Sequence, residues 1–391
     1  MHHQAVFITG IGLISSLGEG VDHHWKLLND PTHPPNLDYT TFAPYPVHTL
    51  PEIDWTLQIP KKSDQRQMGT WQRLGTYAAG LALDDAGMKN NEQLTSTMDM
   101  IVAASGGERD IAVDTQILSQ ARTTADHASM LNLLLSTELR PTLFLAQLSN
   151  LLAGNISIVH KVTGSSRTFM GEEGSGLSAL QIAVARIRSG QSTHALVGSS
   201  YNAQSYDMLL AHELGGLLTQ NEWAPVWDRR NYPGGGVITG SGGIFLVLEN
   251  GEQARKRNAH AYAEISQIIT DQTDRTKISL EETIVSMLET MEAKSAFAIS
   301  SASGSHEVTK AEQNAFETSD IFYRGITTLF GYMREAQLLL ALALSAVAVD
   351  KRRSFPTLST HEKPFFKEVH EAFVTTIGIK RAEGIVRLTA A

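Results

Sequence analysis

The chain has no cysteine among its 391 residues. This absence excludes a disulfide-stapled fold, a thiolate zinc site and an iron–sulfur cluster. It also excludes any reaction that depends on a cysteine nucleophile.

Basic residues are also in short supply, since 32 Lys and Arg against 41 Asp and Glu leave a net charge of −9. An acidic balance argues against a general nucleic-acid binder. Short basic groups such as Lys61–Lys62 and Lys351–Arg353 are typical of solvated surface. We therefore expect no nucleic-acid partner.

Long apolar runs are missing as well. No run reaches about 18 consecutive apolar residues, the length that a membrane span requires. The N-terminal residues lack the apolar stretch and small-residue cleavage site of a signal peptide. These observations predict a cytoplasmic protein without a membrane span.

The composition that remains, 42% hydrophobic and 19% charged residues, is that of an ordinary globular protein. Short β-branched runs alternate with helical patterns, which indicates an α/β fold. The predicted strands are Val6–Thr9, Met100–Ala104, Ser166–Met170, Thr193–Val197, Ile244–Leu248, Ala261–Ile269, Ala296–Ser300 and Ile385–Leu388. The predicted long helices are Trp71–Ala86, Ser175–Arg188, Leu280–Ala293 and Arg334–Asp350.

The pattern restarts near Asn250–Gly251, which divides the chain into residues 1–250 and 251–391. A strand that runs into a small-residue turn occurs in each part, at Ile101–Gly106 and at Ala298–Gly304. This repetition suggests a duplicated α/β unit.

Most motifs with a defined chemistry are absent. There is no Gly-x-Ser-x-Gly elbow, phosphate-binding loop or His-Glu-x-x-His pair, so we expect no metal and no cofactor. Gly174–Gly176 follows a predicted strand, as a dinucleotide fingerprint does. However, Glu172 and Glu173 would repel a pyrophosphate, and no acidic residue lies between Gly174 and Tyr206 to bind a ribose. A nucleotide binder or an unrelated scaffold therefore stays open only as an alternative.

Several segments, in order along nearly the whole chain, resemble the β-ketoacyl-acyl-carrier-protein synthase family. They are Val6–Gly18, Leu83–Gly87, Asn150–Ile158, Gly174–Gly190, Ala195–Ser200, Trp227–Arg230 and Gly240–Glu249. The resemblance implies a thiolase-like fold, in which two similar halves form a five-layered αβαβα sandwich that assembles as a dimer.

The same resemblance implies where the catalytic groups of working members would lie. Their cysteine, at a helix N-terminus, falls on Glu173 here, and their first histidine falls on Ser301. Their second histidine falls near Thr328, where a one-residue gap interrupts the alignment, and their gating loop corresponds to Gly378–Glu383. Every catalytic position is thus altered, and no catalytic residue is expected.

Glu173 itself is better suited to a structural role than to chemistry. A carboxylate is a poor nucleophile toward a thioester, and a helix N-terminus stabilises its negative charge by about 0.3–1 kcal/mol. We expect an ionised Glu173 that caps the helix and fills the space of the missing site. The alternative is a malonyl-carrier decarboxylase or priming enzyme that uses Glu173, although relatives of that kind keep the histidines.

Taken together, the chain resembles a chain-length factor, the non-condensing partner of a ketosynthase in type II polyketide or aryl polyene systems. The resemblance implies a heterodimer with a cysteine-containing ketosynthase, which would also supply most contacts with the acyl carrier protein. It places the tunnel for the growing chain at Asp110, Val113 and Ile117, whose spacings put them on one helix face, although a plain buried face has the same pattern. It places the dimer interface at Leu151, Arg167 and Phe169, although an internal strand would look the same.

Overall fold

The computed structural model describes residues 4–139, 141–232 and 235–391. Its main sheet has eleven strands: two sets of five and the two-residue strand β2 (Gly18–Glu19), which pairs with one of them. The first set is β1 (Val6–Ser15), β5 (Asp99–Ala103), β6 (Ser166–Phe169), β7 (His194–Tyr201) and β9 (Gly242–Asn250). The second set is β10 (Ala263–Asp271), β11 (Phe297–Ser300), β12 (Phe322–Gly325), β13 (Glu371–Ile377) and β14 (Glu383–Thr389).

The two sets repeat one topology. Their strand orders are β6-β5-β7-β9-β1 and β12-β11-β13-β14-β10, with parallel pairing among the outer three strands and antiparallel pairing among the inner ones. The pairs Phe7–Glu264 and Ile8–Ala263 join β1 to β10, so the sheet is continuous. This repetition confirms the prediction of two similar halves, while the boundary at Asn250–Gly251 stays a prediction.

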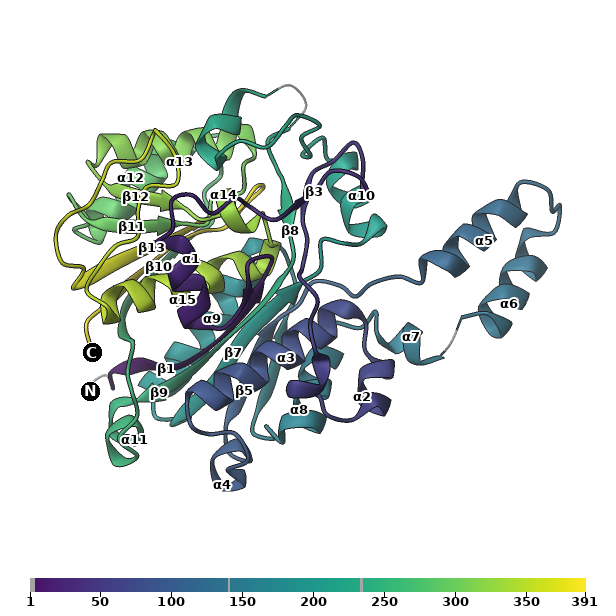
Figure 1. Ribbon diagram of the computed structural model, residues 1–391, viewed down its shortest axis with the longest axis horizontal. Coiled ribbons are helices and arrows are strands. Elements are labelled where there is room, and N and C mark those ends of the chain that lie inside the picture. Colours follow the sequence, from purple (N-terminus) through teal and green to yellow (C-terminus); the bar gives the residue numbers. More distant parts are fainter. Residues whose placement is uncertain (1–3, 140, 233–234) are drawn as a thin grey trace.

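Three layers of helices alternate with the two halves of the sheet, which makes five layers in all (Figure 1). The outer pairs are α3 (Thr70–Asp85) with α8 (Leu151–His160), and α12 (Leu280–Thr290) with α13 (His306–Thr318). The pair α9 (Glu173–Arg188) and α15 (Gln337–Asp350) lies between the two halves of the sheet. The thiolase-like sandwich that the sequence predicts is therefore correct.

The remaining elements lie around this sandwich. The helices are α1 (Val21–Leu28), α2 (Lys62–Gln67), α4 (Glu92–Thr95), α5 (Ile111–Ala121), α6 (His127–Thr137), α7 (Pro141–Leu145), α10 (Tyr206–Leu214), α11 (Gly251–Lys256) and α14 (Thr327–Phe330). The short strands are β2 (Gly18–Glu19), β3 (Leu37–Asp38), β4 (Val47–His48) and β8 (Thr239–Gly240), and the 3₁₀ turns are Trp55–Leu57, Val226–Asn231 and Arg334–Ala336. Helices α5 and α6 form an arm that projects away from the body (Figure 1).

The core explains two features of the sequence. Helix α15 is apolar around its whole circumference because both halves of the sheet pack on it, and all its residues except the last are buried. Gly10 and Gly12 in β1 lack a Cβ because α3 lies directly against them, where a side chain would collide with the backbone of Ala82 and Ala78.

Among the longer strands of the main sheet, β12 and β13 were not predicted from the sequence. Strand β12 contains Arg324, which is buried and hydrogen-bonded to backbone carbonyls, and β13 contains the buried Thr375 and Thr376. Buried polar residues interrupt the apolar run by which a strand is recognised, because their hydrogen-bond partners lie elsewhere in the chain.

Candidate functional site

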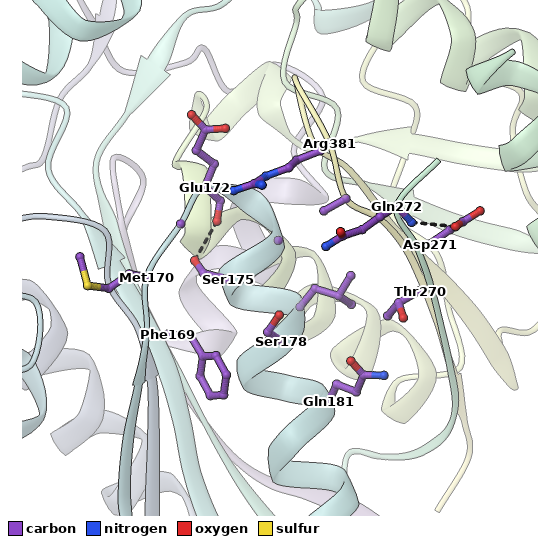
Figure 2. Close-up of a pocket in the computed structure, with 14 residues that line it drawn as sticks. Phe169, Met170, Glu172, Ser175, Ser178, Gln181, Thr270, Asp271, Gln272 and Arg381 are labelled. Carbon is purple, nitrogen blue, oxygen red and sulfur yellow. Dashed lines mark hydrogen bonds between the residues drawn. The ribbon is translucent and has the colours of Figure 1, made fainter. Parts of the chain in front are cut away.

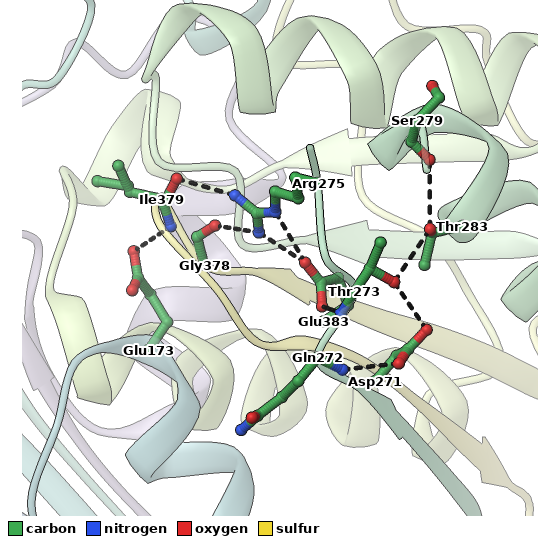
Figure 3. Close-up of polar contacts among 10 residues, drawn as sticks. All are labelled: Glu173, Asp271, Gln272, Thr273, Arg275, Ser279, Thr283, Gly378, Ile379 and Glu383. Atoms are coloured by element: carbon green, nitrogen blue, oxygen red, sulfur yellow. Dashed lines mark hydrogen bonds and ion pairs between the residues drawn. The ribbon is translucent and has the colours of Figure 1, made fainter. Parts of the chain in front are cut away.

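The first residue of α9 and the segment before α15 meet at the centre of the molecule. Glu173 begins α9, with Glu172 as the N-cap residue, and its side chain is only 4% exposed. The two equivalent helices of the halves therefore bring their N-terminal segments together. The loop between β13 and β14 lies over this point (Figure 3).

The carboxylate of Glu173 is held by both of these segments. Its Oε1 accepts a hydrogen bond from the hydroxyl of Tyr332. The same oxygen accepts a 3.2 Å hydrogen bond from the backbone N–H of Ile379 (Figure 3). Tyr332 is itself buried. Glu173 thus joins α9 to the β13–β14 loop and to the segment that leads into α15.

Burial raises the pKa of Glu173 above its ordinary value. The hydrogen bonds from Tyr332, from its own backbone N–H and from Ile379 act in the opposite direction, but they do not outweigh the loss of water. Burial and the neighbouring Glu173 also raise the pKa of Tyr332. Burial therefore opposes the stabilisation of the Glu173 charge that the helix N-terminus provides, and the ionised state of this carboxylate stays a prediction.

The β13–β14 loop is fixed from its other side by Arg275. The guanidinium donates to the carbonyl oxygens of Gly378 (2.7 Å) and Ile379 (2.9 Å), and it forms an ion pair with Glu383 at 2.7 Å (Figure 3). Glu383 is fully buried. The loop is therefore clamped between Arg275 and Glu173.

Ser301 and Thr328 are buried but are occupied by main-chain partners. The Ser301 hydroxyl donates to the carbonyl of Thr375 at 2.6 Å, and the Thr328 hydroxyl accepts from the N–H of Val226 at 3.1 Å. The side chain that reaches Glu173 from this part of the chain is Tyr332, four residues beyond Thr328. Sequence reasoning missed Tyr332, but the predicted duplication contained the signal, since equivalent central helices bring their N-termini together.

A cavity of about 460 Å³ lies beside the first turns of α9 (Figure 2). Its walls come from the end of β6, the end of β10 and the β13–β14 loop, through residues that include Phe169, Glu172, Asp271 and Arg381. Glu173 is not among its lining residues, so the carboxylate is separated from this open space. Among the described residues, no group of three or more His, Asp or Glu side chains could hold a metal ion.

The predicted tunnel residues lie at the base of the arm. Asp110 is not on the face of a helix but is the N-cap of α5, where its carboxylate accepts from the N–H of Val113 at 3.3 Å. Asp110 and Val113 line a hollow of about 640 Å³ together with Leu135, Phe144 and Leu145, whereas Ile117 is not part of it. The prediction that all three residues share one helix face is therefore wrong for Asp110.

The predicted interface residues lie on an edge of the main sheet. Strand β6 is the outermost strand of its half and pairs with β5 alone among the described strands. Arg167 is exposed on it, Phe169 is half-buried against the central core, and Leu151 is half-buried at the start of α8.

Comparison with known proteins agrees with this architecture. Residues 3–254 match the family model "Beta-ketoacyl synthase, N-terminal domain". The chain is 24% identical over 271 residues to 3-oxoacyl-[acyl-carrier-protein] synthase 2 of Vibrio harveyi, which covers 68% of this chain and 62% of that protein. It is 25% identical over 265 residues to the tetracenomycin polyketide synthase ketoacyl synthase beta subunit of Streptomyces glaucescens, covering 65% and 60% of the two chains.

These matches span less than two thirds of the length of the curated relatives. A solved structure, the ishigamide ketosynthase/chain length factor, superposes with a TM-score of 0.79 and 19% identity over the full length of both chains. This likeness shows the fold. In the part of the chain that the structure describes, no helix is both long and apolar enough to cross a bilayer.

Proposed function

Because the chain belongs to the β-ketoacyl synthase family, we propose that it is a non-condensing subunit of the chain-length-factor type. It pairs with a cysteine-containing ketosynthase and shapes the tunnel for the growing polyketide or polyene chain. The observation that carries the proposal is Glu173, a buried carboxylate tied to Tyr332 and Ile379 at the start of α9. The match to a ketoacyl synthase beta subunit supports the same role.

The surroundings of Glu173 disfavour a reaction in this chain. The Ser301 hydroxyl donates a hydrogen bond to a backbone carbonyl, and the Thr328 hydroxyl accepts one from a backbone N–H. Stabilising an enolate requires donors aimed at the developing oxyanion. Since the Ser301 hydroxyl already donates elsewhere and neither position carries a histidine, we assign the condensing chemistry to the partner.

The surface of this chain supports assembly with another subunit. The outer edge of β6 offers unpaired backbone groups, which a second sheet can use. The arm exposes several large apolar side chains, and an exposed apolar patch of this kind marks a protein interaction site. They are Leu118, Leu131, Leu133 and Leu135, followed by Phe144 and Leu145 in α7. We assign these two surfaces to the ketosynthase interface, and the carrier protein then docks mainly on the ketosynthase.

The hollow at the base of the arm supports the role in chain length. Val113 is buried at its wall and faces apolar side chains of α6 and α7. An apolar chain that entered this hollow would stop where the side chains leave no room.

Co-expression with a cysteine-containing ketosynthase tests the proposal. We expect acyl-chain products only when both chains are present, and we expect Glu173→Ala to change their yield less than about twofold, because the carboxylate is not a general acid or base. Native mass of the complex and product analysis are the measurements. Products formed without this chain, or a fall of about 100-fold in malonyl decarboxylation with Glu173→Ala in an intact heterodimer, would contradict it. The second result would favour the decarboxylase alternative.

Changing the volume of Val113 tests the tunnel. Val113→Phe is expected to shorten the products and Val113→Ala to lengthen them, without loss of condensation, because the wall of the hollow moves. Product length by mass spectrometry is the measurement. Ser119→Phe, at an exposed position on the same helix, is the control and should leave product length unchanged. Unchanged product lengths with both Val113 variants would contradict the assignment of this hollow as part of the tunnel.

A further inference from the structure

The loop between α15 and β13 gathers positive charge in an acidic chain. Four exposed cations, Lys351, Arg352, Arg353 and Lys367, line one groove of about 920 Å³. The acidic side chain in its wall, Glu368, lies 3.0 Å from His370. In a chain of net charge −9, this groove is a local site of opposite sign.

Two of the four cations have polar partners within the chain. Lys351 lies 3.3 Å from Asp22, and Arg353 donates to Asn29 at 3.0 Å. Within the residues that the structure describes, Arg352 and Lys367 make no ion pair. These two side chains are therefore available to a ligand.

Buried charged residues hold this loop in a fixed shape. Arg324, 1% exposed, donates to the carbonyl oxygens of Phe355 (3.1 Å) and Lys363 (3.0 Å), one on each side of the loop. The buried Glu362 accepts from the N–H groups of Leu358 (2.7 Å) and Gly325 (2.8 Å). Burying charged groups carries a large desolvation penalty. A loop without a fixed conformation would keep such groups in water, so the buried pair indicates that the shape of this loop is held.

Phe366 stands at the tip of this fixed loop and is 93% exposed, the highest value among the large apolar side chains of the described chain. Its neighbour Phe365 turns inward and packs against Phe297 and Phe322, with ring centroids 5.4 and 5.2 Å apart. The ring of Phe365 therefore anchors the loop, and the ring of Phe366 faces solvent beside Lys367.

This surface lies away from Glu173. Helix α15 begins near Tyr332 and runs for 14 residues, about 20 Å, before it reaches Lys351. The groove is therefore at the opposite end of α15 from the clamped loop. The arm projects from the other side of the molecule (Figure 1).

We propose that this loop docks on an anionic phospholipid surface. Arg352, Lys367 and their neighbours bind lipid phosphates in the groove, and the Phe366 ring inserts at the level of the headgroups. The arrangement suits a membrane better than a protein partner. Protein interfaces have cores depleted in charge and bury about 800 Å² on each side, whereas here a single exposed ring stands among cations.

Co-sedimentation of the full chain with vesicles tests this proposal. We expect binding to phosphatidylcholine vesicles that contain phosphatidylglycerol, no binding to pure phosphatidylcholine, and weakening by salt. Arg352→Ala combined with Lys367→Ala should lower the partition coefficient about 25-fold, because each cation near an anionic surface is worth about 1 kcal/mol, or about fivefold. Phe366→Ala should lower it about tenfold through lost burial.

Matched variants separate this surface from general effects of charge and apolar area. Lys61→Ala with Lys62→Ala removes the same charge elsewhere, and Leu214→Ala removes another exposed apolar side chain. Both should bind vesicles within about twofold of the unaltered chain. Equal losses with these controls, absence of binding to the anionic vesicles, or complete displacement by glycerol phosphate would each overturn the proposal. Groove variants that weaken the ketosynthase complex while vesicle binding persists would instead show a protein contact.

Discussion

Replacing Arg275 by alanine is expected to lower the free energy of unfolding by about 3 kcal/mol and to release the loop at residues 378–382. The guanidinium pairs with Glu383, which is fully buried, and it also binds the carbonyl oxygens of Gly378 and Ile379. Removing one member of a buried pair leaves the other charge without a partner, which typically costs about 3–5 kcal/mol. Since Arg275 is partly exposed, the lower end applies.

A matched variant elsewhere isolates the effect on the loop. Arg257 pairs in the same way with Glu249, a fully buried carboxylate that also accepts from Thr9. Arg257→Ala should therefore lose a similar amount of stability in chemical unfolding. Only Arg275→Ala should increase amide hydrogen exchange at residues 378–382. Equal exchange there in both variants would show that Arg275 does not hold the loop.

This clamp bears on the proposed function. The loop is bound on one side by the carboxylate of Glu173 and on the other by Arg275. A loop that must move during a catalytic cycle comes from the less stable parts of a fold. A loop fixed at both sides fits a subunit that completes an assembly without a reaction of its own.

Much of the fold could be predicted because it rests on local patterns. Apolar runs of the right period marked most long strands and helices, and the small-residue turns at Ile101–Gly106 and Ala298–Gly304 pointed to the duplication. The place of Glu173 at the start of α9 followed from the resemblance to the β-ketoacyl-acyl-carrier-protein synthase family, since the predicted helix itself began only at Ser175.

The partners of Glu173 could not be identified from local patterns, because they come from distant parts of the chain; for Tyr332 the signal lay only in the duplication. Tyr332 and Ile379 lie 159 and 206 residues away in sequence, and no local pattern links them. Asp110 was misjudged for a different reason. Its spacing to Val113 also fits an N-cap, and a carboxylate at that position is preferred as a cap over a place on a helix face.

Glu312→Gln is expected to remove a pH dependence of stability worth about 3 kcal/mol. Glu312 is fully buried; its Oε1 accepts from Ser300 at 2.9 Å and from Thr375, while Oε2 has no hydrogen-bond partner among the described residues. Burial raises the pKa of Glu312 from 4.5 to about 7. Because the folded state binds this proton more tightly than the unfolded state, the contribution is fully present below about pH 4.5 and is lost as the pH rises through about 7.

The size of the effect follows from the shift. One pKa unit corresponds to about 1.36 kcal/mol, so the unaltered chain loses about 3 kcal/mol from this group between about pH 4.5 and 8. The glutamine side chain keeps the shape and stays neutral. In urea unfolding, the free energy of unfolding of the variant should therefore rise relative to that of the unaltered chain as the pH increases across this range. Glu317→Gln, at an exposed position on the same helix, should follow the unaltered chain within about 0.5 kcal/mol. Parallel pH profiles for Glu312→Gln and the unaltered chain would mean that Glu312 stays ionised in the folded protein, which would require a cation or water at Oε2.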